Sequence, residues 1–92
     1  MSDPVVSQIR EQITDADRVL VETMNKRLKL VQQLWRYKEQ HGLPLHDPAR
    51  EAWMLTYLTR ANRGPLSPAG LAELYAQVLE LTKRETAQPA EA

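Results

Sequence analysis

The sequence predicts an all-α protein of three helices, one very long and two shorter, that assembles as a two-fold dimer. Three observations lead to this fold class. First, the stretch from Val5 to His41 contains neither proline nor glycine, and its apolar residues recur every three or four positions. Second, a capping residue followed by proline, a common start signal for a helix, occurs at positions 3–4, 47–48 and 67–68. Third, no stretch of the chain alternates apolar and polar residues as a strand does.

The long first helix requires a second chain. Thirty-seven residues would make a helix of about 55 Å at 1.5 Å per residue, whereas a compact chain of this size has a radius of gyration of only about 12 Å. One chain therefore leaves much of the apolar stripe of this helix in water, and a second copy is the simplest cover. The stripe consists of Ile9, Ile13, Ala16, Leu20, Met24, Leu28, Val31 and Leu34.

The remaining helices follow from local signals. Gly42 and Pro44 end the first helix, and the second runs from Asp47-Pro48 to about Ala61, where Asn62-Arg63-Gly64-Pro65 stops it. The third helix begins at Ser67-Pro68 and continues to about Thr86. We therefore expect one domain over residues 1–86, with residues 87–92 as a mobile tail or the start of a linker.

Composition excludes several classes of function. Twelve Lys and Arg balance twelve Asp and Glu, so the basic surplus typical of a nucleic-acid binder is missing. The chain has no Cys and only two His, which leaves no thiolate nucleophile and too few ligands for a His-based metal site. No signal peptide and no apolar run long enough to span a membrane is found. We expect a cytoplasmic protein without a metal or cofactor.

Cations on the apolar stripe are the main functional signal. Arg27 lies midway between Leu20 and Leu34, and Lys38 shares its face about 16 Å further along the helix. Arg10 precedes Arg27 by about 25 Å and lies about 100° round the helix, so it can reach this site only from the partner in an antiparallel dimer. Converging cations favour a small ligand with two carboxylates. Alternatively, Arg27 extends to solvent along its aliphatic stem, and Lys38 simply favours the helix C-terminus.

Four further polar residues are candidates. Arg50 lies in the first turn of the second helix, where a cation opposes the helix dipole, and it shares a face with apolar residues. Asp47 is well explained as a cap, and Glu51 fits a solvated face as well as a site. Thr82 lies on the core side of the third helix, where its hydroxyl needs a hydrogen-bond partner.

Taken in order, these residues resemble the all-helical class of chorismate mutase. The resemblance extends from Val5 to about Thr86, and its segments are Ile9–Asp17, Asn25–Arg27, Lys38 and Asp47–Glu51. The connector before Asp47 and the turn at 62–65 look most like the mutase domains fused to DAHP synthases in some bacteria, which makes a DAHP synthase a candidate partner. The resemblance implies an intertwined homodimer with two sites, each built from both chains.

The resemblance also implies roles for individual residues. Arg10 of the partner and Arg27 would bind the substrate carboxylates, and Lys38 would bind a carboxylate and donate to the ether oxygen. Asp47, Arg50 and Glu51 would line the site, with Glu51 receiving the ring hydroxyl. The remaining two family positions fall in the third helix, where Thr82 matches a residue that is usually Ser, and Thr86 one that is usually Gln or Glu.

Two departures from the family leave alternatives open. We expect the rearrangement of chorismate to prephenate, but the side chain of Thr86 is shorter than Gln or Glu. This leaves open a weakly catalytic or non-catalytic domain that senses chorismate or prephenate for a DAHP synthase. Trp35 and Tyr37 replace small residues before Lys38 and either narrow the site or serve in packing. Isochorismate pyruvate lyase and rearrangement of an amino analogue of chorismate remain enzyme alternatives, and a helical dimerisation module without a ligand remains the alternative without chemistry.

Overall fold

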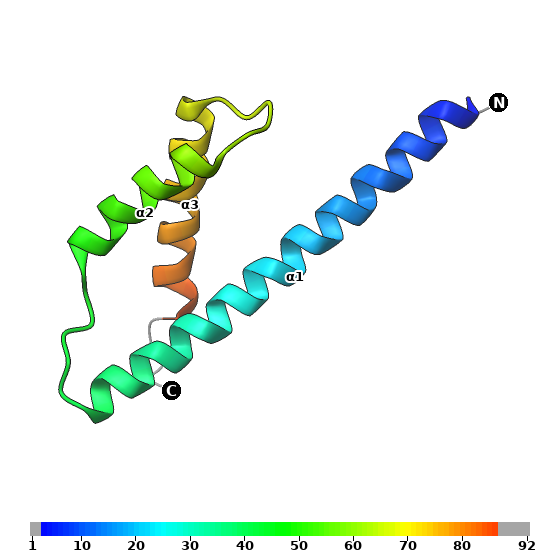
Figure 1. The fold of residues 1–92 in the computed structure, drawn as a ribbon. Coiled ribbons are helices and arrows are strands. Elements are labelled where there is room, and N and C mark those ends of the chain that lie inside the picture. The colour runs from blue at the N-terminus through cyan, green and yellow to red at the C-terminus, as the bar shows by residue number, and fades with distance from the viewer. Residues whose placement is uncertain (1–2, 87–92) are drawn as a thin grey trace.

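A computed structural model describes residues 3–86, which form three α-helices and, within that range, no strand. Helix α1 spans Pro4–Gln40, α2 spans Pro48–Ala61 and α3 spans Pro68–Thr86 (Figure 1). The predicted all-α class, with one very long and two shorter helices, is confirmed. The observed bounds of α1 differ from the predicted Val5 to His41 by one residue at each end.

Side-chain caps fix all three helix starts. The Asp3 carboxylate accepts hydrogen bonds from two backbone N–H groups in the first turn of α1, at 2.8 and 3.3 Å. The Asp47 carboxylate accepts the backbone N–H of Arg50 at 3.1 Å. The Ser67 hydroxyl accepts the backbone N–H of Gly70 at 2.9 Å. Each bond satisfies a donor that the helix leaves unpaired, so the three predicted start signals are confirmed.

The helices form an elongated body rather than a compact one. The chain measures 60 × 32 × 16 Å, and its radius of gyration of 17.3 Å exceeds the value of about 12 Å for a compact chain of this length. Helices α2 and α3 form a hairpin beside the C-terminal half of α1, and the N-terminal half of α1 extends away from them (Figure 1). Helix α3 contacts both other helices and holds the hairpin against α1.

The core of one chain is very small. Among residues 3–86, only Leu71 and Tyr75 are buried apolar residues, and both keep 9% of their surface exposed. On the stripe of α1, Ile13 is 54% exposed and Leu20 is 63% exposed. Further along, where the hairpin approaches, Val31 is half-buried, whereas Leu34 at the end of the stripe is 49% exposed. One chain therefore covers only a part of its own apolar stripe.

None of the helices within the described range has both the length and the apolar character needed to cross a lipid bilayer.

The left-handed backbone at Gly42 generates a stability prediction. Gly42 has φ = 64°, and the position beyond its Cα is open, so an added Cβ would strain the backbone without meeting a neighbour. We expect Gly42→Ala to lower the free energy of unfolding by about 1–2 kcal/mol, measured by urea denaturation at fixed protein concentration. Gly64→Ala is the matched control, because Gly64 also has open space but no left-handed φ. Equal free energies of unfolding for the two variants would contradict the left-handed backbone conformation of Gly42.

Candidate active site

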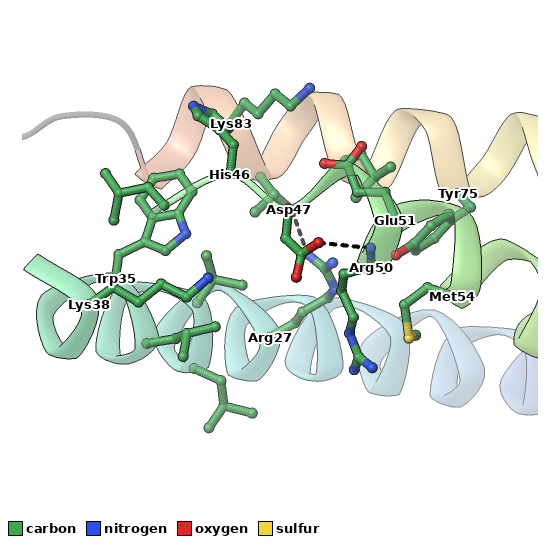
Figure 2. A pocket seen from close by; sticks show the side chains of 16 residues that line it. Arg27, Trp35, Lys38, His46, Asp47, Arg50, Glu51, Met54, Tyr75 and Lys83 are labelled. Carbon is green, nitrogen blue, oxygen red and sulfur yellow. Dashed lines mark hydrogen bonds between the residues drawn. The ribbon is translucent and has the colours of Figure 1, made fainter. Parts of the chain in front are cut away.

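A cleft of about 340 Å³ lies where α1, the connector and the α2–α3 hairpin meet, and we call it the central cleft (Figure 2). Its volume falls in the range of small-molecule sites. Leucine, valine and methionine side chains form its apolar walls, with the rings of Trp35 and Tyr75 among them. Its charged lining consists of Arg27, Lys38, Asp47, Arg50, Glu51 and Lys83.

Arg27 is held by a contact between α1 and α3. The residue is half-buried, and its Nη1 donates a hydrogen bond of 2.6 Å to the hydroxyl of Thr82, which is itself buried. The predicted partner for the Thr82 hydroxyl is therefore found. The bond joins residues that are 55 positions apart in the chain, and it fixes the guanidinium at the cleft.

Lys38 enters the central cleft from the last turn of α1. It is half-buried, and its side chain extends along the cleft in the direction of Arg27 (Figure 2). The expected shared face of Arg27 and Lys38 is confirmed, because both line the same cleft. The position of Lys38 in the last turn of α1 also favours a cation, because the helix dipole is negative at that end. A position in the cleft and a favourable interaction with the dipole are therefore compatible.

The start of α2 brings three charged residues to the opposite wall. Asp47 caps the helix, and Arg50 and Glu51 follow in its first turn. The guanidinium of Arg50 lies 4.8 Å from the ring centre of Trp53. This cation–π contact helps to hold the Arg50 side chain in place. Glu51 is half-buried and also lines the cleft. The cap at Asp47 thus sets the direction in which these side chains leave the helix.

The cations of the central cleft lack acidic partners at close range. In the part of the chain that the structure describes, the only ion pair within 4 Å joins Arg18 and Glu22 on the surface of α1, at 3.2 Å. Four cationic side chains line the cleft against two carboxylates, so the site carries an excess of positive charge. Partly buried cations are costly unless an anion neutralises them, and guanidinium groups bind carboxylates well. The arrangement is suited to binding a small anion.

Two predicted site residues do not line this cleft. Arg10 is exposed on the N-terminal half of α1, away from Arg27 in the same chain. Thr86 is 5% exposed, and its hydroxyl donates a 2.6 Å hydrogen bond to the backbone carbonyl of Thr82. Substrate binding by these two residues stays a prediction.

Sequence reasoning missed two charged or titratable lining residues, His46 and Lys83, and left Trp35 undecided between the site and packing. His46 lies in the connector, where no periodicity indicates direction. Lys83 follows Thr82 directly, so helical periodicity points its Cβ about 100° away from that residue. The only sequence signal for these residues is their position, because His46 precedes Asp47 and Lys83 follows Thr82. Within residues 3–86, no group of three or more His, Cys, Asp or Glu side chains is placed to hold a metal ion.

Comparison with known proteins decides the family. The family model of chorismate mutase type II matches residues 9–87. The chain belongs to this family. The family predicted from the sequence is thereby confirmed, and the match reaches all three helices and includes every residue that lines the central cleft.

Several relatives of this mutase-family chain are much longer proteins. The T-protein of Haemophilus influenzae is 39% identical over 82 residues, which are 88% of this chain and 21% of that protein. The bifunctional chorismate mutase/prephenate dehydratase of Pseudomonas aeruginosa is 29% identical over 76 residues, which are 77% of this chain and 21% of that protein. The chain therefore spans about a fifth of the length of these curated relatives. Their names do not mention DAHP synthase, and that association stays a prediction.

Solved structures agree with the family. A chorismate mutase structure (form II) from Thermus thermophilus superposes with a TM-score of 0.83 and 28% sequence identity, covering 90% of this chain and 94% of that chain. A second structure of the Thermus enzyme (form I) gives a TM-score of 0.79 and 30% identity, covering 84% and 96% of the two chains. The three-helix arrangement is thus the fold of these two chorismate mutase structures.

Proposed function

We propose that the chain is a chorismate mutase, which rearranges chorismate to prephenate in the biosynthesis of phenylalanine and tyrosine. The observation that carries this proposal is the central cleft, where Arg27 and Lys38 face a small volume without a carboxylate partner within 4 Å among residues 3–86. Chorismate is a small dicarboxylate, and its two carboxylates match this excess of positive charge. Membership of the chorismate mutase type II family supports chorismate as the dicarboxylate that the cleft binds.

A two-fold homodimer would complete both the fold and the site. Ile9, Ile13 and Leu20 are at least half exposed in one chain, and a second copy laid antiparallel would bury them. The same arrangement would bring Arg10 of each chain to the central cleft of the other. Arg10 is exposed and outside its own cleft, which leaves its guanidinium available to a partner.

The reaction needs binding and charge stabilisation rather than a nucleophile. One C–O bond breaks while one C–C bond forms in the same molecule, so the protein must hold the enolpyruvyl arm over the ring. Arg27 and the Arg10 of the partner would clamp the two carboxylates. Lys38 would donate a hydrogen bond to the ether oxygen, on which negative charge grows as the C–O bond breaks. Glu51 would accept a hydrogen bond from the ring hydroxyl, and Asp47 and Arg50 would line the same side of the central cleft.

One observation favours a second candidate function. The family usually places a longer donor at the position of Thr86, whereas the Thr86 hydroxyl here bonds to a backbone carbonyl outside the cleft. A domain with only one donor to the ether oxygen would bind chorismate and convert it slowly, as a sensor attached to or associated with a DAHP synthase would. Measuring both the binding and the turnover of chorismate distinguishes the mutase from the sensor. Product analysis distinguishes both from a lyase that releases pyruvate.

Analytical ultracentrifugation tests the dimer. We expect the wild-type chain to sediment as a dimer at micromolar concentration, and Leu20→Asp to shift it toward monomer because the substitution places two charges in the interface. Lys29→Asp is the matched control, because Lys29 is exposed and lies half a turn round α1 from Leu20. A wild-type monomer that still converts chorismate would refute the dimeric site.

Substitution of the cleft cations tests the chemistry. We expect Lys38→Ala and Arg27→Ala each to lower turnover of chorismate by about 10²–10³, because each removes a preorganised donor to the substrate. Loss of chorismate is followed spectroscopically, and circular dichroism checks that the fold persists. The controls are Lys29→Ala and Arg36→Ala, which change exposed residues of α1 outside the cleft. Near-normal kinetics in either cleft variant would reject its assigned role.

Mixing two inactive variants tests the shared site. Arg10→Ala and Arg27→Ala damage different parts of the same composite site, so a mixed dimer holds one site with both arginines intact. After random exchange of subunits, we expect recovery of about a quarter of wild-type activity, because half of the dimers are mixed and each has one intact site. Lack of recovery, with exchange demonstrated by native mass spectrometry, would mean that both arginines act within one chain.

A further inference from the structure

Thr82 is one of the α3 residues that line the central cleft, and its hydroxyl already makes two hydrogen bonds within the protein. The Thr82 hydroxyl donates to the backbone carbonyl of Val78 at 2.6 Å and accepts Nη1 of Arg27 at 2.6 Å. A threonine hydroxyl carries one proton and two lone pairs. Because the single proton is directed along the helix to Val78, Thr82 presents only acceptor capacity to the cleft, and Arg27 uses it.

The same pattern repeats one turn later. The Thr86 hydroxyl donates to the backbone carbonyl of Thr82 at 2.6 Å, in the same bond to the fourth residue back. Both threonines are buried residues, at 6% and 5% exposure, so these hydrogen bonds lie largely away from bulk water. Neither threonine therefore offers a hydroxyl proton to an anion in the central cleft, and Thr82 acts on the cleft through Arg27.

We propose that Thr82 is a positioning residue that aims the Arg27 guanidinium into the central cleft, rather than a residue that donates to the substrate. This inference rests on the proposed function for its kinetic test. An arginine side chain loses considerable rotamer entropy when a ligand orders it. A charge-assisted bond from Nη1 to a buried oxygen orders the side chain in advance and leaves the remaining N–H groups of the fork for a carboxylate.

The chemistry of the bond fits this role. Thr82 is neutral, so it holds the guanidinium without cancelling its charge, as an Asp or Glu at the same place would do. Its acceptor is strengthened because the hydroxyl proton is itself donated to Val78. The helix α3 backbone thereby fixes the position of a cation that belongs to α1, and the site keeps its excess of positive charge.

Two substitutions at position 82 separate the roles of hydroxyl and shape. Thr82→Val keeps the volume and removes the acceptor, and Thr82→Ser keeps the hydroxyl. We expect Thr82→Val to lower kcat/KM for chorismate about ten- to hundredfold, the value of a hydrogen bond to a charged group, and Thr82→Ser to stay within about threefold of wild type. Equal activity of wild type and Thr82→Val would overturn the proposal. If Thr82→Val fails to fold, Thr82→Ala removes the same acceptor in its place.

A double-mutant cycle with Arg27→Ala distinguishes positioning from direct donation. If Thr82 acts through Arg27, adding Thr82→Val to Arg27→Ala changes the residual kcat/KM by less than about threefold. If Thr82 contacts the substrate, the full loss reappears in the double variant and the proposal fails. Where the residual rate is too low to measure, a crystal structure of Thr82→Val decides: a displaced or disordered Arg27 guanidinium beside an unchanged α3 supports the proposal, and an unmoved guanidinium overturns it.

The proposed function and this inference fail in different ways. A wild-type protein that binds no chorismate and produces no prephenate refutes the function, and the crystal structure of Thr82→Val still tests the position of Arg27. A wild-type protein that converts chorismate, with unchanged kinetics in Thr82→Val, refutes only the positioning role.

Discussion

The length of α1 is the constraint on which the rest of the structure depends. Its 37 residues extend well beyond the α2–α3 hairpin, which covers only the C-terminal half (Figure 1). The covered half therefore carries the central cleft, because three helices meet only there. The uncovered half keeps residues such as Ile13 and Leu20 in water, and among residues 3–86 one chain buries only two apolar residues. In the dimer we propose, one helix would serve two sites.

The electrostatics of the central cleft follow from the same geometry. Arg27 and Lys38 leave one face of α1, and the cap at Asp47 turns the first residues of α2 toward that face. Gathering cations in a partly buried space lowers the stability of the folded protein. Such a cluster is therefore typical of a site where an anionic ligand neutralises the charge. Neutral contacts hold the cluster: the Thr82 hydroxyl for Arg27 and the Trp53 ring for Arg50. Neither contact cancels the charge that a dicarboxylate would use.

The sequence determined most of the fold because its local signals agree with one another. Each cap with its following proline marks a helix start within one residue of the observed one, and Gly42 adopts the left-handed conformation that stops α1. Helical periodicity placed Arg27 and Lys38 on one face. It could not place Lys83, because direction round a helix does not reveal where a long flexible side chain meets a neighbouring helix. The stacking of Arg50 on Trp53 and the bond from Thr86 to the Thr82 carbonyl depend on rotamers, which spacing does not encode.

The central claim is that two chains together enclose one small dicarboxylate. The most direct measurement is a crystal structure of the protein with a dicarboxylate analogue of the rearranging substrate. We predict a two-fold dimer in which Arg10 of the partner chain contacts the same ligand as Arg27 and Lys38. An Arg10 guanidinium that points into bulk solvent, far from any neighbouring cleft that holds the ligand, would contradict it.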